Sequence, residues 1–197
     1  MNSQLQKMKD AIKAYQKKAQ EAQQKIERAR QLYQEKPAQE EAQRIRAGLE
    51  KDRQVAIDAI RAAKNEGVAA VKGWATKDGS KLTDDVNLLK NGLINPKEFA
   101  GMVEKYSDNY TMLEMLRTYG ETMNAEKAKD AHGIPADAFP VGMIPTADGK
   151  LSRWDNIENS AVSMLDSLSG NGDPRDLRNS PYMQDIAVEN WGNNVEI

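Results

Sequence analysis

The side chains that most often carry out chemistry are scarce in this sequence. It contains no cysteine and a single histidine, His132, which excludes a thiolate nucleophile, a disulfide framework and a zinc site built from cysteines or several histidines. His132 lies in a stretch rich in glycine and proline, and no serine has the flanking glycines of a nucleophile elbow. We therefore expect no catalytic residues, no metal site and no enzymatic activity.

Carboxylates could serve acid–base chemistry where two lie close together. Asp84 and Asp85 are adjacent, but they lie where a helix is predicted to begin, and the helix dipole favours acidic residues there. The dipeptides Asp78-Gly79 and Asp148-Gly149 are not followed by the oxygen ligands and closing glutamate of an EF-hand. No phosphate-binding glycine loop is present, so we expect no cofactor.

Composition favours long thin helices over a large core. Of the 197 residues, 39% are hydrophobic, 29% are charged and 6% are aromatic, so apolar burial must come mainly from alanine and aliphatic side chains. The longest apolar runs have only a few residues, too short for a membrane span. Polar sequence follows Met1 where a secretory signal would be apolar. We expect an all-α protein that is made in the cytoplasm.

The net charge of −2 conceals an asymmetry along the chain. Residues 1–74 carry 16 basic and 10 acidic side chains, a net charge of +6, whereas residues 75–197 carry 12 and 20, a net charge of −8. Opposite charges in the two parts favour head-to-tail association, or binding of the basic part to an acidic partner. The asymmetry affects association rather than the choice of fold.

Small and apolar residues recur at the start of the chain with alternating spacings of three and four. This is the heptad pattern of a coiled coil, in which such residues form the seam against a partner helix. A solvent-exposed helix on a globule is the alternative interpretation. The alanines in the middle of the seam allow close helix approach but contribute little apolar area. The predicted coiled-coil interface consists of Leu5, Met8, Ile12, Tyr15, Ala19, Ala22, Ile26, Ala29 and Tyr33.

A second long helix is predicted from about residue 38 to residue 74, and Pro37 separates it from the first. Proline is tolerated in the first turn of a helix but not in its interior. The flanks of the first seam carry lysine and arginine without acidic partners, which argues against a parallel homodimer. The first domain, residues 1–75, therefore either folds back at Pro37 as a helical hairpin or continues past a kink and pairs with another chain.

Residues 80–125 are predicted to form a compact module of three helices. Asn95-Pro96 followed by Glu98 is the pattern of a capping box, and Asn109 is suited to cap the next helix. Gly92 stands where the C-terminal cap of the preceding helix belongs. Methionine, tyrosine and leucine side chains of this module supply most of the bulky core of the chain.

Residues 126–197 are predicted to form an acidic tail in which proline and glycine interrupt short helices. One helix is expected from Ser152 to about Leu168, and another near residues 181–190. Aromatic side chains on such short segments are typical of a region ordered by a partner. The alternative is that the tail wraps its own chain. The candidate docking residues are Trp154, Tyr182 and Trp191.

Four motifs in the middle module carry a resemblance to a known group of proteins. They are Thr83–Leu89, Asn95–Phe99, Asn109–Leu113 and Arg117–Tyr119, and they look like segments of proteins encoded in head-assembly gene clusters of tailed phages and prophages of Firmicutes. The resemblance covers about residues 80–125. The preceding segment, rich in Ala, Gln, Lys and Glu, is similar in style to phage scaffolding and minor virion proteins, so the resemblance implies capsid or portal subunits as partners.

The resulting hypothesis is a non-enzymatic phage structural or assembly protein that associates through its helices and docks on a capsid or portal component. It would act in the bacterial cytoplasm during assembly, with the virion as a further location. The alternative is a small nucleic-acid-associated or regulatory binding protein, because basic residues crowd the first helix, although no aromatic stacking platform accompanies them. These basic residues are Lys7, Lys9, Lys13, Lys17, Lys18, Lys25, Arg28 and Arg30.

Overall fold

The computed structural model describes residues 3–129, 137–169 and 181–191, except for the side chains of Pro181 and Tyr182. All regular structure in these ranges is helical, which confirms the predicted all-α fold. The predicted helical hairpin at the N-terminus is also confirmed.

The chain divides into two compact units. One is formed by Met1–Val68 together with Ser152–Ile197, and the other by Ala69–Leu151. The first unit therefore combines sequence from both ends of the chain. The predicted tail, residues 126–197, is not a third segment, because it is divided between the two units.

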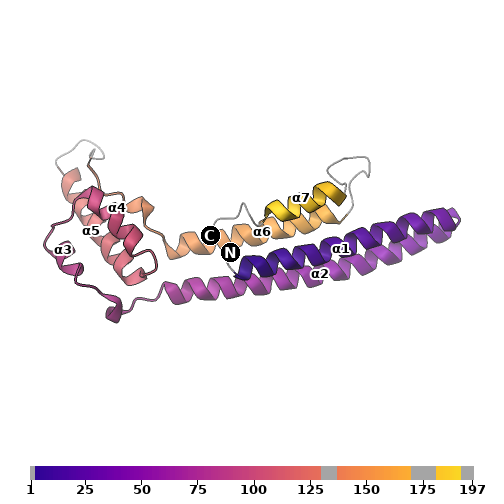
Figure 1. Cartoon of the computed structure of the whole chain (residues 1–197), viewed down its shortest axis with the longest axis horizontal. Coiled ribbons are helices and arrows are strands. Elements are labelled where there is room, and N and C mark those ends of the chain that lie inside the picture. The colour runs from indigo at the N-terminus through magenta and orange to yellow at the C-terminus, as the bar shows by residue number, and fades with distance from the viewer. Residues whose placement is uncertain (1–2, 130–136, 170–180, 192–197) are drawn as a thin grey trace. The chain divides into compact units, whose positions relative to one another are not determined.

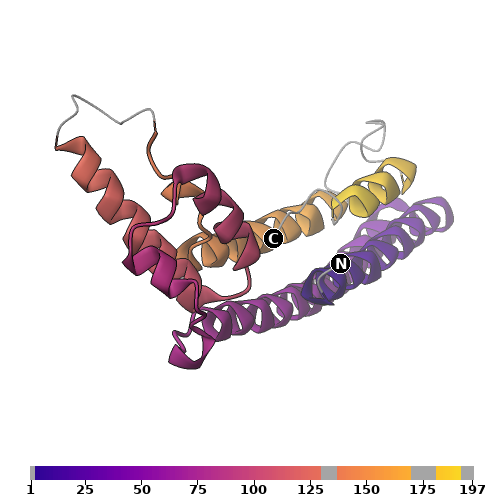
Figure 2. The ribbon, with the colours of Figure 1, turned by 60° about the vertical axis from the view of Figure 1, so that its left-hand side comes forward.

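Helices α1 (Ser3–Leu32) and α2 (Glu35–Trp74) lie side by side as a long antiparallel hairpin in the first unit (Figures 1 and 2). An ion pair of 2.5 Å between Lys7 Nζ and Glu66 Oε2 joins the two helices far from the turn. The partner of the α1 seam is thus the next helix of the same chain.

The hairpin turn falls just before the predicted break. The chain folds back at Tyr33 and Gln34, and Pro37 already belongs to the first turn of α2. A proline in that turn costs no helical hydrogen bond, because the first N–H groups of a helix have no carbonyl partner within it. Pro37 therefore stabilises the start of α2 and causes no kink.

Most of the predicted seam is buried, but its last position is not. Ile26 is half-buried, and Tyr33 is 55% exposed. Tyr33 was expected to continue the interface; it lies beyond the last residue of α1, where the helical repeat no longer directs the side chain toward α2. The buried members of the seam are Leu5, Met8, Ile12, Tyr15, Ala19, Ala22 and Ala29.

Helices α6 (Ala147–Leu168) and α7 (Pro181–Trp191) complete a four-helix bundle in the first unit, with α6 against α2 and α7 against α1 (Figures 1 and 2). The two helices face each other, since Trp191 Nε1 donates a hydrogen bond of 3.0 Å to Ser160 Oγ. The buried side chains of α6 recur every three or four residues and are Trp154, Ile157, Ala161, Leu165 and Leu168.

Helix α6 begins earlier than predicted. The expected start was Ser152, whereas the helix starts at Ala147. The hydroxyl of Thr146 accepts a hydrogen bond of 2.9 Å from the backbone N–H of Gly149, which is the contact of an N-terminal cap. The Asp148-Gly149 dipeptide is therefore the first turn of a helix.

The second unit contains short helices with the predicted end signals. Asn95 and Glu98 form the complete capping box, and the side chain of Asn109 accepts a hydrogen bond from the N–H of Met112. Gly92 has a φ of 65°, the left-handed conformation that ends helices. The elements are η1 (Gly79–Lys81), α3 (Val86–Lys90), α4 (Pro96–Lys105), α5 (Tyr110–Ala128) and η2 (Val141–Met143).

The core of the second unit includes residues that were assigned to the tail. Phe139 and Ile144 are both 3% exposed within it. The ring of Phe139 packs edge-on against those of Phe99 and Tyr119, with ring centroids 5.4 Å apart in each pair. The proline- and glycine-rich connector thus supplies core residues that the three helices alone lack.

Gly67 on α2 offers a test of the packing in the first unit. A Cβ atom at this position would lie 2.3 Å from two atoms of the Trp154 ring, whereas one at Gly48, also within α2, would have nothing within 4 Å. We expect Gly67→Ala to lower the free energy of unfolding by about 1–3 kcal/mol through overpacking. Gly48→Ala should raise it by about 0.5–1 kcal/mol, because alanine favours helix.

Urea unfolding followed by circular dichroism measures both variants. Equal stability of Gly67→Ala and Gly48→Ala would contradict the seating of the indole on Gly67.

Candidate functional site

The residues first considered for chemistry do not converge in the described ranges. His132 lies outside them. Asp85 directly precedes α3 but makes no cap hydrogen bond. Its carboxylate instead accepts hydrogen bonds from Lys105 Nζ at 2.7 Å and from the Tyr106 hydroxyl at 2.6 Å, and these two donors lower the pKa of Asp85. We predicted that the dipole of the following helix accounts for Asp85. The structure instead shows its carboxylate in contact with the C-terminal end of α4.

A second acidic candidate is also used in a structural contact. Asp78 accepts hydrogen bonds from the N–H and the hydroxyl of Ser80, at 2.9 and 2.7 Å, and so begins η1. In the part of the chain that the structure describes, no group of three or more His, Asp or Glu residues is arranged to hold a metal ion.

Two of the three aromatic residues expected to dock on a partner belong to the core of the bundle. Trp154 is 1% exposed and Trp191 is 7% exposed. The side chain of Tyr182 lies outside the described residues. The expectation that Trp154 and Trp191 are free for a partner is therefore wrong, and the alternative, in which they pack on their own chain, holds for both. Their spacing was compatible with either, because a buried and a docking aromatic have the same sequence pattern.

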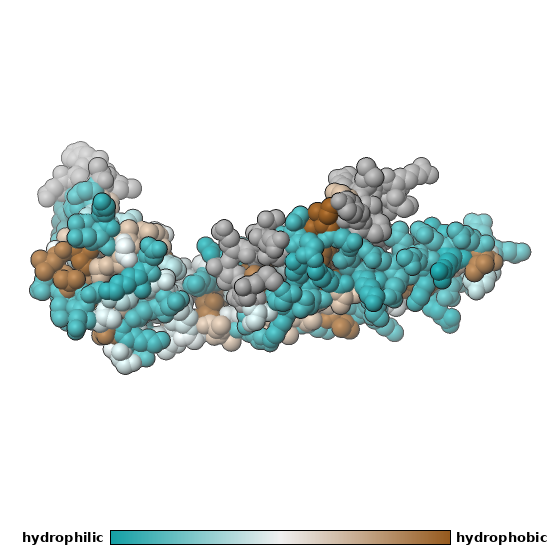
Figure 3. All heavy atoms as spheres, in the orientation of Figure 1, coloured by the Kyte–Doolittle hydropathy of each residue, from teal (hydrophilic) through white to brown (hydrophobic). Residues whose placement is uncertain are grey.

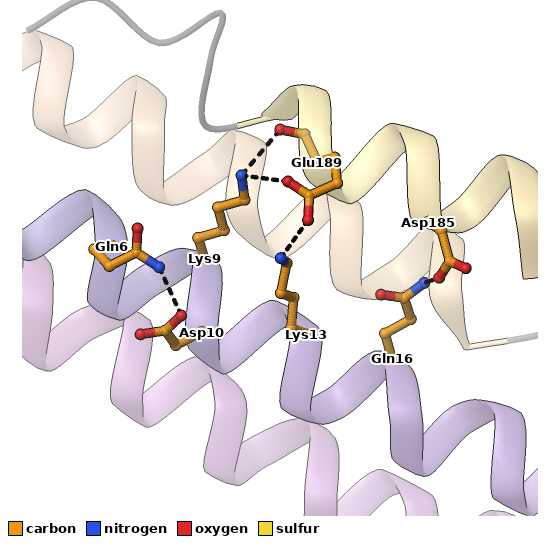
Figure 4. Close-up of polar contacts among 7 residues, drawn as sticks. All are labelled: Gln6, Lys9, Asp10, Lys13, Gln16, Asp185 and Glu189. Carbon is orange, nitrogen blue, oxygen red and sulfur yellow. Dashed lines mark hydrogen bonds and ion pairs between the residues drawn. The ribbon is translucent and has the colours of Figure 1, made fainter. Parts of the chain in front are cut away.

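The contact between α7 and α1 is polar and carries opposite charges (Figure 4). Lys9 Nζ donates to Glu189 Oε2 at 2.9 Å and to the Glu189 carbonyl oxygen at 3.1 Å, although the Lys9 side chain is only 8% exposed. Lys13 binds the other oxygen of the same carboxylate. Gln16 Nε2 donates to Asp185 Oδ1 at 2.6 Å. Lys13 and Lys9 together lower the pKa of Glu189 to about 2.

A second row of ion pairs joins α2 to α6. Lys64 Nζ lies 2.7 Å from Glu158 Oε2 and 2.5 Å from Asp155 Oδ1, and Arg61 also pairs with Glu158. The Lys64 and Arg61 donors lower the pKa of Glu158 against the effect of burial. Asp155 and Glu158, a carboxylate pair that could have served acid–base chemistry, are therefore neutralised by α2.

The last pair of this row lies at the end of α6. The guanidinium of Arg53 binds Asp166 through Nε at 3.0 Å and through one terminal nitrogen, which raises the pKa of Arg53. Tyr15 lines a small cavity beside this pair, and burial raises the pKa of its hydroxyl to about 12. Beyond Leu168, α6 no longer covers the hairpin.

The turn end of the hairpin, which no other described helix covers, contains a groove with a volume of about 510 Å³. Arg30 and Tyr33 line it from the α1 side and the turn, and α2 supplies the remaining wall. Leu32 beside the turn is 75% exposed. Over the face seen in Figure 3 the surface is mostly hydrophilic, with apolar residues only in small patches. The α2 residues of the wall are Glu35, Ala38, Gln39, Ala42, Gln43 and Arg46.

Sequence reasoning missed this groove. The heptad pattern identifies the residues that face the partner helix, but it does not say where the covering helices end. The available signal was the repeat of Glu35, Gln39, Gln43 and Arg46 along one face of α2, which has the spacing of a second helical stripe.

Comparisons with known proteins find no matching family model, no similar curated protein and no similar solved structure. None of the helices within residues 3–129, 137–169 and 181–191 combines the length and apolar character that crossing a membrane requires.

The α1–α7 contact makes stability depend on pH through Glu189. Its pKa lies at about 2 rather than 4.5, so its stabilising effect is complete above pH 4.5 and is lost as the pH falls toward 2. We expect Glu189→Gln to be less stable than the natural protein near neutral pH. It should also lose less stability between pH 4.5 and 2.

Urea unfolding at a series of pH values measures this difference. The matched control is Glu27→Gln, which removes an exposed carboxylate of α1 for which the described residues provide no ion pair. Identical pH profiles for Glu189→Gln and the natural protein would show that the contact does not hold α7.

Proposed function

We propose that the protein is a non-enzymatic structural or assembly protein of a tailed phage, of the scaffold-like or minor virion kind. It acts by association through its long helices and by docking on a capsid or portal component. Its place of action is the bacterial cytoplasm during assembly, and the virion if it is retained there.

The observation that carries this proposal is the end of the α1–α2 hairpin at the turn, which extends beyond α6. We call it the hairpin end. Two helices continue past the last turn of α6 and present a polar groove together with the exposed side chains of Leu32 and Tyr33. A rod of this kind is suited to protein contacts rather than to enclosing a substrate, because small-molecule sites are concave and mostly apolar. The resemblance of residues 80–125 to head-assembly proteins supports the phage setting.

The use of charged groups supports a non-enzymatic role. Of the acidic residues on α6 and α7, Asp155, Glu158, Asp166 and Glu189 all form ion pairs with α1 or α2. Their pairing serves to hold helices in register. A catalytic carboxylate is instead usually found in a cleft beside a reacting group.

Co-expression with the coat and portal proteins of the phage that encodes it tests this proposal. We expect the protein to co-sediment with assembled particles, or to change their yield and size, when compared with co-expression of coat and portal alone. A variant with one heptad removed from each hairpin helix, residues 23–29 and 39–45, should keep the bundle of α1, α2, α6 and α7 but lose these effects, because its hairpin end is one heptad shorter and lacks part of the groove wall.

The control for this experiment is the Gly48→Ala variant, which keeps the hairpin length and should behave as the natural protein does. Particles that form in equal yield and size with and without the protein, and that contain none of it, would contradict the proposed role.

A second candidate function is binding of nucleic acid through the basic first helix. Lys7, Lys9 and Lys13 are already paired with Glu66 and Glu189, which weakens this candidate. It is favoured only by the basic residues nearer the turn, for which the described residues provide no ion pair. An affinity for duplex DNA that falls steeply with salt, and that is lost when these residues are neutralised, would favour it. They are Lys17, Lys18, Lys25, Arg28 and Arg30.

A further inference from the structure

The hairpin end lacks the two helices that cover the rest of the hairpin. Nearer the N-terminus of α1, the hairpin is covered by α7 on α1 and by α6 on α2. Past the end of α6 at Leu168, the described residues provide no such cover, and the groove of about 510 Å³ follows. Within the described residues, the same hairpin therefore has one section that is complete as a four-helix bundle and one that has only two helices.

Arg46 occupies a position equivalent to that of Arg53. The two residues are one heptad apart on α2, so their side chains leave the helix in nearly the same direction. Arg53 binds the carboxylate of Asp166 on α6, whereas in the described ranges no carboxylate pairs with Arg46. The contact made by Arg53 indicates what suits Arg46, namely an acidic residue on another helix.

The wall that α2 gives to the groove is complementary to itself. Its residues have the spacing of one helical face, and the two ends of this face carry opposite charges, Glu35 at one end and Arg46 at the other. Reversing α2 about a point between Glu40 and Glu41 places Glu35 opposite Arg46. The same reversal places Ala38 opposite Gln43 and Gln39 opposite Ala42.

A second copy of the chain fits this pattern in a way that an unrelated helix need not. In a two-fold symmetric contact each pair of residues occurs twice, because residue i of one copy contacts residue j of the other and residue j contacts residue i. Two copies would then form two Glu35–Arg46 ion pairs at the ends of the contact. Ala38 and Ala42, which are 5% and 8% exposed, form the floor of the groove, and the exposed side chains of Gln39 and Gln43 would make the contact between the two ion pairs. Glu35 is available, since its carboxylate accepts only a long hydrogen bond of 3.4 Å from Gln39 within the described residues.

We propose that two copies of this protein associate antiparallel through their hairpin ends, with α2 of one copy in the groove of the other. The contact completes at the hairpin end the four-helix arrangement that α6 and α7 provide elsewhere. The dimer rests on the proposed assembly function, which includes self-association, and it identifies the surface through which this self-association occurs. Residues 35–46 span only about 17 Å of helix at 1.5 Å per residue, so the dimer is weak and reversible.

Charge reversal at the two ends of the contact tests this proposal. Glu35→Arg alone places two arginines together at each end, and Arg46→Glu alone places two glutamates together. Each should weaken dimerisation about tenfold or more. The double variant Glu35→Arg with Arg46→Glu restores opposite charges across the two-fold axis and should return the affinity to near that of the natural protein. Sedimentation equilibrium of the full chain over a range of concentrations at low salt measures all three.

Two matched controls make the same charge changes away from the groove. Glu41 and Arg44 lie on α2 and pair with each other at 3.8 Å, but they do not line the groove. Glu41→Arg and Arg44→Glu should leave the dimer unchanged. Circular dichroism checks that Glu35→Arg, which changes the first turn of α2, still folds; Arg46→Glu provides an independent test away from the helix start.

Several outcomes would overturn the proposal. They are a monomer at all concentrations, a dimer that neither single reversal weakens, and two weakened single variants that the double variant does not rescue. The proposed function fails separately. A monomer that still co-sediments with particles overturns only the dimer, whereas a rescued dimer with no effect on coat or portal assembly overturns only the phage role.

Discussion

A pair of helices joined along a narrow seam buries too little apolar surface to hold a fold by itself, and this constraint governs the first unit. The large side chains of the α1 seam, from Leu5 to Tyr15, lie in the half that α6 and α7 cover. Nearer the turn, the buried seam residues of α1 are the alanines Ala19, Ala22 and Ala29. Because each alanine contributes little apolar area, the stability of the unit is concentrated where four helices overlap. The turn end depends on that section for its position.

Opposite charges then decide how the covering helices align. In the contacts that join them, α1 and α2 contribute the cations, and α6 and α7 contribute the anions. The charge asymmetry of the sequence, which could have indicated association between chains, is therefore satisfied in part inside one chain. Exposed ion pairs contribute little stability individually. A row of them along two interfaces penalises a shift of register, because a shifted helix would separate the opposite charges.

The predictions that succeeded depended on local physics. The heptad spacing of α1, the capping box at Asn95 and the left-handed glycine at Gly92 each involve residues within a few turns of one another. The failures involved contacts between distant segments. Asp85 meets Lys105, and Phe139 enters a core built by preceding helices. Nothing near Asp85 or Phe139 in the sequence distinguishes such a partner from solvent, so fold class and helix ends were predictable and the docking of the tail was not.

The hairpin turn at Tyr33 and Gln34 has a consequence for assembly. Had α1 and α2 been one kinked rod, the seam would have required another chain, and association would have been strong and obligatory. Because the seam is satisfied within the hairpin, the association proposed above uses the groove near the turn, whose exposed lining is polar and short. Polar contacts of that size form and dissociate readily, and their strength depends on salt. The proposed dimer is therefore expected to be in equilibrium with a folded monomer and to form only when the local concentration rises.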